Sequence, residues 1–232
     1  MNYQTTPNAV AQSSVEERSA FIMRTYLHLA GAIFAFVGLE AVLFASGLVS
    51  PILSLLGSTR FAWLLVMAGF VGVSYLADNW ARSATSVGMQ YAGLGLYVLA
   101  QSIIFVPLLA MAAVYAPGVI PKAGLITLVL FAGLTGVVFI TRKDFSFLRG
   151  ALMLGGFAGI GLIVASILFG FDLGLFFSWA MLVLAAGYIL YDTSNVMLHY
   201  RTDQHVSAAL ALFASVALML WYVLRILMNS RR

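Results

Sequence analysis

Three acidic residues and one arginine stand inside or at the ends of long apolar runs, where a charged side chain is costly. Asp192 directly follows the run that ends at Tyr191. Asp78 and Arg82 are four residues apart, so a helix through both would place them on one face as an ion pair. Glu40 lies roughly sixteen residues into the first run, about 24 Å along a helix. Ionisable groups in such positions commonly bind ions or protons.

The chemistry that Asp192 could perform is proton or cation binding. A carboxyl group that is partly withdrawn from water and close to a cation changes its proton affinity, so it can respond to pH. Arg82 could reach Asp192 across neighbouring helices and hold this end of the protein closed until Asp192 is protonated. Two plainer interpretations stay open: Asp192 can mark the edge of the apolar layer, and Asp78 with Arg82 can form an exposed pair of little energy. Glu40 either faces a water-filled cavity or is neutral and hydrogen-bonded.

Several reaction classes are excluded by residues that the chain lacks. Without cysteine it has no thiol nucleophile, disulfide or thiolate metal site. An aspartyl protease would need a second acid to share a water with Asp192, and residues 206–228 contain none. No glycine-rich phosphate loop with a following lysine is present, and the histidines at 199 and 205 match no established metal-site spacing. We expect no enzyme activity, no catalytic residue, no cofactor and no bound metal.

Seven long apolar runs must position these side chains. Apolar residues make up 62% of the chain and charged residues 9%, far from the composition of a soluble domain. About 20 apolar residues in a helix cross the hydrocarbon layer of a bilayer, and the runs lack the alternation of barrel strands. The predicted spans are 24–48, 61–76, 87–111, 123–140, 148–169, 173–191 and 206–228. The predicted fold is an all-α membrane protein, a bundle of seven transmembrane helices.

The chain divides into two predicted parts. Residues 1–20 are polar, with too little apolar surface to pack, and are expected to form a flexible tail. They do not have the pattern of a cleavable signal peptide. Residues 21–232 are expected to form the transmembrane domain, with short breaks between spans at turn-forming pairs such as Ser50-Pro51 and Pro117-Gly118.

Lysine and arginine are unevenly divided between the two sides of this predicted bundle. One side carries Arg18, Arg24, Arg82, Arg142, Lys143, Arg149 and Arg201, and the other carries Arg60, Lys122, Arg225, Arg231 and Arg232. Short cytoplasmic loops retain positive charge, so the bias predicts a cytoplasmic N-terminus and a C-terminus outside. The arginines at the C-terminus point the other way, which a re-entrant last segment would explain. The net charge of +4 then reflects topology, and no nucleic-acid partner is expected.

Two strings of the sequence resemble the Bax inhibitor family of seven-span membrane proteins. The strings are Thr141-Arg142-Lys143-Asp144-Phe145-Ser146-Phe147-Leu148 and Gly187-Tyr188-Ile189-Leu190-Tyr191-Asp192-Thr193-Ser194-Asn195. Together they most resemble the bacterial YccA-like branch, and the likeness covers the whole chain in the number and order of spans. The resemblance implies the seven-helix fold of this family and a place in the bacterial inner membrane. The motif residues that it marks are Lys143, Asp144, Ser146, Tyr191, Thr193 and Asn195.

The resemblance also implies a site. Family members that leak calcium use two membrane aspartates and close the site with an arginine at the end of the second span. Asp192 matches the first aspartate and Arg82 is the counterpart of the arginine, but Ser215 stands where the second aspartate would be. A lone carboxylate offers few of the six to eight oxygen ligands that Ca²⁺ prefers, which disfavours calcium conduction.

Two functions are predicted. YccA-like proteins resemble modulators and slow substrates of the membrane-anchored ATP-dependent protease FtsH, and a polar N-terminal tail is a handle that a pulling ATPase could engage. The first prediction is therefore an inhibitor or slow substrate of the FtsH complex. The alternative is a pH-sensitive leak channel or transporter for calcium ions or protons. Its gate would comprise Asp192, Arg82, Asp78, Ser215 and Glu40, and the lipid bilayer is a partner in both cases.

Overall fold

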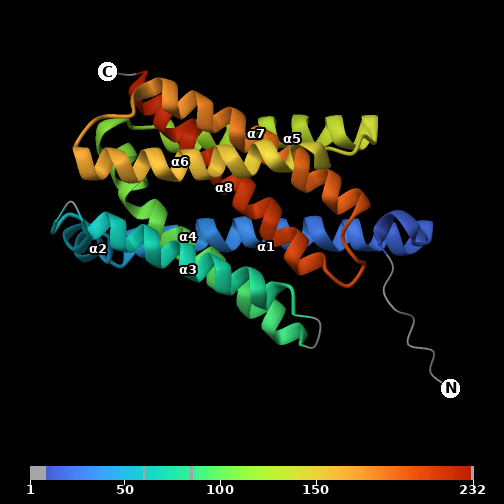
Figure 1. Cartoon of the computed structure of the whole chain (residues 1–232). Coiled ribbons are helices and arrows are strands. Elements are labelled where there is room, and N and C mark those ends of the chain that lie inside the picture. Colours follow the sequence, from blue (N-terminus) through green and yellow to red (C-terminus); the bar gives the residue numbers. More distant parts are fainter. Residues whose placement is uncertain (1–8, 60, 84–85, 231–232) are drawn as a thin grey trace.

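The computed structural model describes residues 9–59, 61–83 and 86–230, which form an all-helical bundle (Figure 1). Its elements are η1 (Val10–Gln12), α1 (Val15–Ala45), α2 (Val49–Leu56), α3 (Ala62–Ala81), α4 (Val87–Tyr115), α5 (Val119–Thr141), η2 (Ser146–Leu148), α6 (Arg149–Phe169), α7 (Gly174–Leu198) and α8 (His205–Asn229). In this described part, seven helical segments are long and apolar enough to cross a membrane. The predicted fold class and the order of the spans are therefore confirmed.

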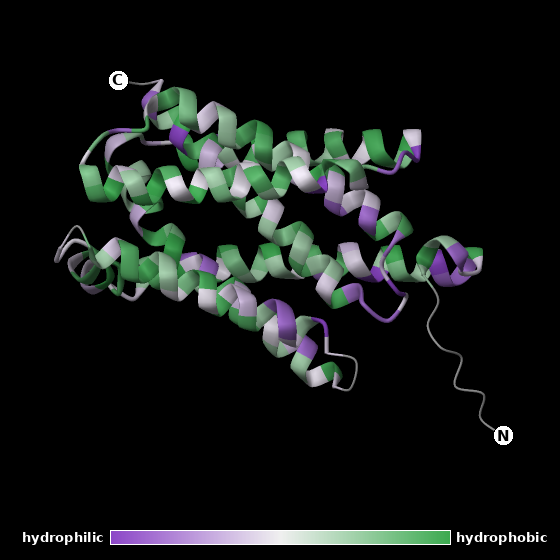
Figure 2. Cartoon of the chain, in the orientation of Figure 1, coloured by the Kyte–Doolittle hydropathy of each residue, from purple (hydrophilic) through white to green (hydrophobic). Residues whose placement is uncertain are grey.

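Helix α8 runs through the middle of the bundle. It crosses between a layer that contains α1, α3 and α4 and a layer that contains α5, α6 and α7 (Figure 1). All five residues from Val206 to Leu210 are buried, as expected for a helix that is enclosed on every side. The outer helices instead expose large apolar side chains such as Ile140 (84%) and Phe176 (87%). Those side chains suit contact with lipid, and Figure 2 shows hydrophobic residues along the helices with hydrophilic ones gathered near their ends.

The N-terminal segment differs from the expected flexible tail over its described part. Helix α1 begins at Val15 because Ser14 and Glu17 form a capping box: the Ser14 hydroxyl accepts from the Glu17 amide, and the Glu17 carboxylate accepts from the Ser14 amide. Before it, Val10 in η1 is fully buried. The predicted boundary at residue 20 therefore falls inside a helix, while residues 1–8 of the predicted tail lie outside the described residues.

Two further helices extend beyond their predicted ends. Helix α3 continues past Leu76 to Ala81, and α7 continues past Tyr191 to Leu198. Hydropathy falls at the first charged residue, but the backbone hydrogen bonds continue until a cap ends them. In α7 the Asn195 carbonyl accepts from the amides of His199 and Tyr200, at 2.8 and 3.0 Å, which terminates the helix.

A short helix, α2, occupies a stretch that the sequence suggested was only a break. Pro51 is tolerated there because it lies in the first turn of α2, where the backbone N–H groups have no partner within the helix. Arg60, one of the charges used to predict orientation, lies outside the described residues. The N-terminal and C-terminal ends of the bundle lie at opposite ends of the long helices (Figure 1), in agreement with an odd number of crossings.

Helices α3 and α4 approach closely at Gly93. A Cβ atom on Gly93 would lie 2.5 Å from the Ala77 carbonyl oxygen and 2.6 Å from the Ala81 amide nitrogen. Such distances are too short for any side chain, so glycine is required for this contact. The same contact fixes the end of α3 that carries Asp78 and Arg82.

We expect Gly93→Ala to destabilise the bundle by about 1–3 kcal/mol, because backbone atoms of α3 cannot move aside for a methyl group. Gly95→Ala is the matched control, since nothing lies within 4 Å of a Cβ at Gly95, and there alanine should be neutral or stabilising by up to about 1 kcal/mol. Unfolding midpoints of both variants in the same detergent measure the difference. Equal midpoints would contradict the close α3–α4 contact.

Candidate functional site

Asp192 is buried between α7 and α8, where it contacts Ser215. Its exposed fraction is 9%, and the Ser215 hydroxyl donates a hydrogen bond of 2.5 Å to Asp192 Oδ2. Asp192 therefore does not stand in the headgroup water that the plainer interpretation would require. The structure also brings together the two positions at which the family resemblance implied a pair of aspartates. A carboxylate and a hydroxyl face each other there instead of two carboxylates.

Asp78 and Arg82 form the ion pair that their spacing predicted. Arg82 Nε lies 2.8 Å from Asp78 Oδ2, and the two side chains are 49% and 40% exposed. A pair this exposed contributes little to stability. The predicted direct contact between Arg82 and Asp192 is absent from the described part of the chain, because Arg82 turns to Asp78, its neighbour one turn earlier on the same helix. The charge of Arg82 is nevertheless close enough to Asp192 to act on it electrostatically.

Tyr200, which sequence reasoning did not single out, links these charged groups. It lies in the α7–α8 loop, and its phenol is close to Asp192, Arg82 and Asp78. Burial, reinforced by the charge of Asp192, raises the pKa of Tyr200 to about 12 against the opposing effect of Arg82. Its hydroxyl therefore stays neutral at physiological pH. In the sequence Tyr200 is one tyrosine among ten, and only the turn of the chain after α7 brings it back over the site.

The N-terminal segment fastens this loop. The Val10 amide donates to the Tyr200 carbonyl at 2.9 Å, and Ala9 pairs with Arg201 in an isolated antiparallel bridge. Because Val10 is fully buried, the contact combines an apolar anchor with a backbone hydrogen bond. We refer to residues Ala9 and Val10 as the N-terminal strap. The strap holds the loop that carries Tyr200.

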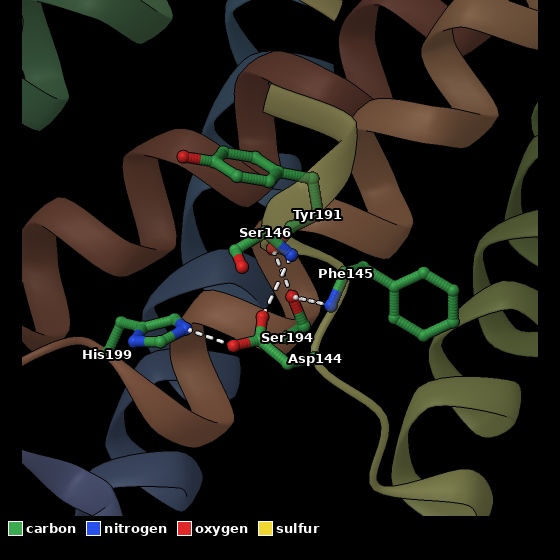
Figure 3. A network of polar contacts seen from close by, with 6 residues as sticks. All are labelled: Asp144, Phe145, Ser146, Tyr191, Ser194 and His199. Carbon is green, nitrogen blue, oxygen red and sulfur yellow. Dashed lines mark hydrogen bonds and ion pairs between the residues drawn. The ribbon is translucent and has the colours of Figure 1, made fainter. Parts of the chain in front are cut away.

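Motif residues of the α5–α6 loop form a second polar network, next to the end of α7 (Figure 3). Asp144 Oδ1 accepts from the Ser146 amide at 2.8 Å, and Asp144 Oδ2 lies 2.9 Å from His199 Nε2. The Phe145 amide donates to the Ser194 hydroxyl at 3.2 Å. The hydrogen bond from the Ser146 amide is the largest of the effects that lower the pKa of Asp144. Asp144 is therefore ionised at neutral pH and ties the loop to the end of α7.

The other motif residues have structural rather than chemical surroundings. Lys143 is exposed in the loop, and the Tyr191 carbonyl accepts from the Ser194 hydroxyl at 2.9 Å. Thr193 is fully buried, close to the hydroxyl groups of Tyr26 on α1 and Thr135 on α5. Thr193 joins α7 to its neighbours, and among the described residues none of these side chains has a hydrogen bond to the Asp192 carboxylate.

Glu40 lies apart from the Asp192 site. Its side chain is 7% exposed, and neither carboxylate oxygen has a hydrogen-bond partner among the described residues. The sequence allowed two environments for Glu40, a water-filled cavity or a neutral, hydrogen-bonded state. The described structure supplies no hydrogen bond for the second. The five predicted gate residues therefore divide into a cluster of four at the ends of α3, α7 and in α8, and Glu40 by itself in α1.

The Asp192 site offers a carboxyl group that can take up a proton, and it supplies few ligands for a metal ion. A single carboxylate and a hydroxyl supply few hard oxygen ligands. In the described part of the chain no group of three or more His, Cys, Asp or Glu side chains is arranged to hold a metal ion. A buried carboxyl group within the electrostatic reach of a cation is instead an arrangement that can change state on protonation.

Comparison with known proteins places these residues in a family context. The sequence model of the family described as "Inhibitor of apoptosis-promoting Bax1" matches residues 18–232. An uncharacterized protein of Pseudomonas aeruginosa is 31% identical over 157 residues, which are 66% of this chain and 68% of the relative. An uncharacterized protein of Neisseria meningitidis is 25% identical over 181 residues, 75% of each chain. An uncharacterized membrane protein of Vibrio cholerae is 29% identical over 116 residues, 48% of this chain and 50% of the relative.

We expect Asp144→Ala to free the α5–α6 loop from α7, because it removes a charge-assisted hydrogen bond and the contact with His199. Hydrogen bonds to charged groups contribute about 1.5–3 kcal/mol, so exchange of the Ser146 amide should speed up roughly tenfold or more. Hydrogen–deuterium exchange at pH 7 measures this. Since the pKa of Asp144 is lowered in the folded protein, the protection should persist as pH falls until it reaches values below roughly 4, the usual range for Asp.

Lys143→Ala is the matched control for this experiment, because Lys143 is an exposed neighbour in the same loop. Exchange in 143–148 should be unchanged in this variant. Equal exchange rates in both variants would mean that Asp144 does not hold the loop.

Proposed function

The chain belongs to the Bax inhibitor family, and we propose that this multi-pass membrane protein is a pH-sensitive cation leak of the bacterial inner membrane, controlled at Asp192. The observation that carries the proposal is a carboxylate buried in a membrane-spanning helix, hydrogen-bonded to Ser215 and within the electrostatic reach of Arg82. Retaining a charge at such a place costs free energy, which favours a role in ion or proton movement. The N-terminus is cytoplasmic in this proposal, the protein is not an enzyme, and Ser215 disfavours calcium as the main ion.

Proton binding at Asp192 supplies the gating step. While Asp192 is ionised, its negative charge attracts Arg82 at the end of α3 and so draws α3 toward α7 and α8. When Asp192 takes up a proton, that attraction disappears, and Arg82 keeps its contacts with Asp78 and Tyr200. The end of α3 is then free to move away, which opens the side of the bundle that carries Tyr200. Acidification on this side therefore increases the leak.

We expect Asp192→Asn to abolish the pH response of cation flux in proteoliposomes that contain only this protein. Asparagine cannot ionise, so flux at neutral pH should equal that of the natural protein in acid. Loss of an attraction of about 1 kcal/mol corresponds to a change of roughly fivefold in the open population. Cation flux through the variant and the natural protein is detected with a fluorescent dye and compared between pH 5 and 8.

Glu40→Gln is the matched control, because it removes the other buried carboxyl group without touching Asp192. It should leave the pH response intact, and a response that depends on Glu40 instead of Asp192 would contradict the proposal. Ser215→Asp adds a second carboxylate beside Asp192 and therefore further hard oxygen ligands, so it should raise the calcium component of the flux. Absence of flux in every variant would exclude the leak function.

A second candidate function is modulation of the protease FtsH, as an inhibitor or slow substrate. The N-terminal strap favours it: residues 1–8 precede Val10, which is anchored on the loop over Asp192. A protease complex that holds or pulls on these residues would exert force on the Val10 anchor before the complex reached the membrane helices. Slow degradation follows from this picture, because a buried anchor and seven membrane helices resist extraction.

We expect removal of residues 2–8 to lengthen the lifetime of the protein in cells that contain the protease, because no handle would then precede the anchor. Replacement of the same residues by an equally long Gly-Ser segment is the matched control and should preserve turnover. Pulse-chase measurement in cells with and without the protease separates this effect from general instability. If turnover is the same for both variants, or if the difference persists without the protease, this candidate function is wrong.

A further inference from the structure

Two adjoining cavities open between the layers at the end of the bundle opposite to Asp192. Their volumes are about 420 and 540 Å³, which lies in the size range of ligand sites. They lie among α3, α4, α6, α7 and α8 and the α6–α7 loop. The residues common to both cavities are Trp63, Asp172, Trp221 and Arg225. The shared residues make the two cavities one continuous site.

The interior of the smaller cavity is mainly apolar, with Gln101 and Ser166 as polar exceptions, and its walls come from four helices. Met67 and Phe70 on α3, Ile163 on α6 and Leu218 on α8 line it, together with Tyr97 on α4. Water finds few polar partners in such a space, since most of the lining side chains are apolar. A hydrocarbon chain suits it, because it brings apolar contacts and loses nothing in leaving the surrounding lipid.

The mouth of the site holds two opposite charges that do not neutralise each other. Arg225 and Asp172 line both cavities, yet no ion pair or hydrogen bond of Arg225 is found in the described part of the chain. Asp172 uses one oxygen, Oδ1, to accept from the Gly174 amide at 3.0 Å, and the residue is exposed. A guanidinium and a carboxylate are therefore both available to a ligand that enters between them.

We propose that this site binds one zwitterionic phospholipid of the phosphatidylethanolamine class. Its phosphate pairs with Arg225, whose guanidinium matches phosphate oxygens in a two-pronged arrangement. Its primary ammonium donates to Asp172, and one acyl chain enters the apolar cavity. Trp63 and Trp221 lie at the level of the headgroup boundary, the depth that tryptophan favours in membranes. An anionic lipid without an amine would leave Asp172 unmatched and its own charge close to that carboxylate.

The test uses Trp221 as the only tryptophan, with Trp63, Trp80 and Trp179 replaced by Phe. Trp221 lines both cavities and packs on Phe105 with ring centres 5.1 Å apart. Phosphatidylethanolamine with brominated acyl chains, which quench tryptophan fluorescence on contact, is titrated into phosphatidylglycerol vesicles that contain this variant. We expect quenching of Trp221 that saturates at a low mole fraction of the brominated lipid. Brominated phosphatidylglycerol in the same titration should give weaker quenching without saturation.

A variant with Trp179 as the only tryptophan is the matched control, since Trp179 is 51% exposed on α7 and faces bulk lipid. Its quenching should rise in proportion to mole fraction with either lipid. In the Trp221 variant, Arg225→Ala should raise the mole fraction of brominated phosphatidylethanolamine at half-saturation by roughly tenfold or more. This is the loss of affinity expected when a charge-assisted hydrogen bond is removed. Arg225→Lys keeps the charge and should shift it less, and Asp172→Asn should reduce the preference for the ethanolamine headgroup.

Two results would overturn the proposal. One is quenching of Trp221 that is the same for both headgroups and insensitive to Arg225, which would mean that bulk lipid merely enters the cavity. The other is the absence of quenching, which would mean that no acyl chain enters. Because the measurement needs neither ion flux nor a protease, it is independent of both candidate functions.

Discussion

The hydrogen bond from Ser215 to Asp192 is the interaction on which the arrangement of the bundle's polar end depends. A carboxylate between two membrane helices has no water to solvate it, so it needs a donor and a cation from the protein. Ser215 supplies the donor from α8, and Arg82 supplies the cation from the end of α3. Both requirements can be met only if α3, α7 and α8 converge at one end. The enclosed position of α8, between the two layers of helices, brings this about.

The two ends of the molecule handle charge in different ways. At the Asp192 end the charges lie close to one another, beside the loop with Tyr200 that the N-terminal strap fastens. At the other end Arg225 and Asp172 face a roomy apolar site without pairing in the described structure. Tyr97 lines that site, and its ring packs on Phe213, two residues before Ser215 on α8. The bundle therefore has a closed polar end and an open end, separated by aromatic side chains.

Much of this structure could be predicted from the sequence, and the exceptions have identifiable causes. The spans and their order follow from hydropathy, because the bilayer leaves helices as the only solution for such runs. Helix ends were predicted less well, since α7 continues through Asp192 to Leu198 where hydropathy has already fallen. The start of α1 was missed although Ser14 and Glu17 form a recognisable capping signal. The pairing of Asp78 with Arg82 was predictable because both residues lie on one helix.

Contacts between distant segments could be predicted only through the family resemblance. It pointed to Ser215 as the counterpart of a second aspartate, and the two side chains do meet. No property of the sequence indicated that Tyr200 would return over Asp192 or that Val10 would pack against that loop. Such contacts depend on how long helices cross, and the crossing is determined by close packing at positions such as Gly93. The prediction of a direct Arg82–Asp192 bridge was wrong for a local reason, because Asp78 lies nearer to Arg82 on the same helix.

The bridge between Ala9 and Arg201 joins two residues that lie 192 positions apart in the chain. During synthesis the ribosome delivers α1 to the bilayer long before the α7–α8 loop exists, so the N-terminal segment must wait for its partner. Contacts between such remote parts of a chain form late in folding. The cover over Asp192 is thus completed only when the whole bundle has been inserted, and a nascent chain carries this site open.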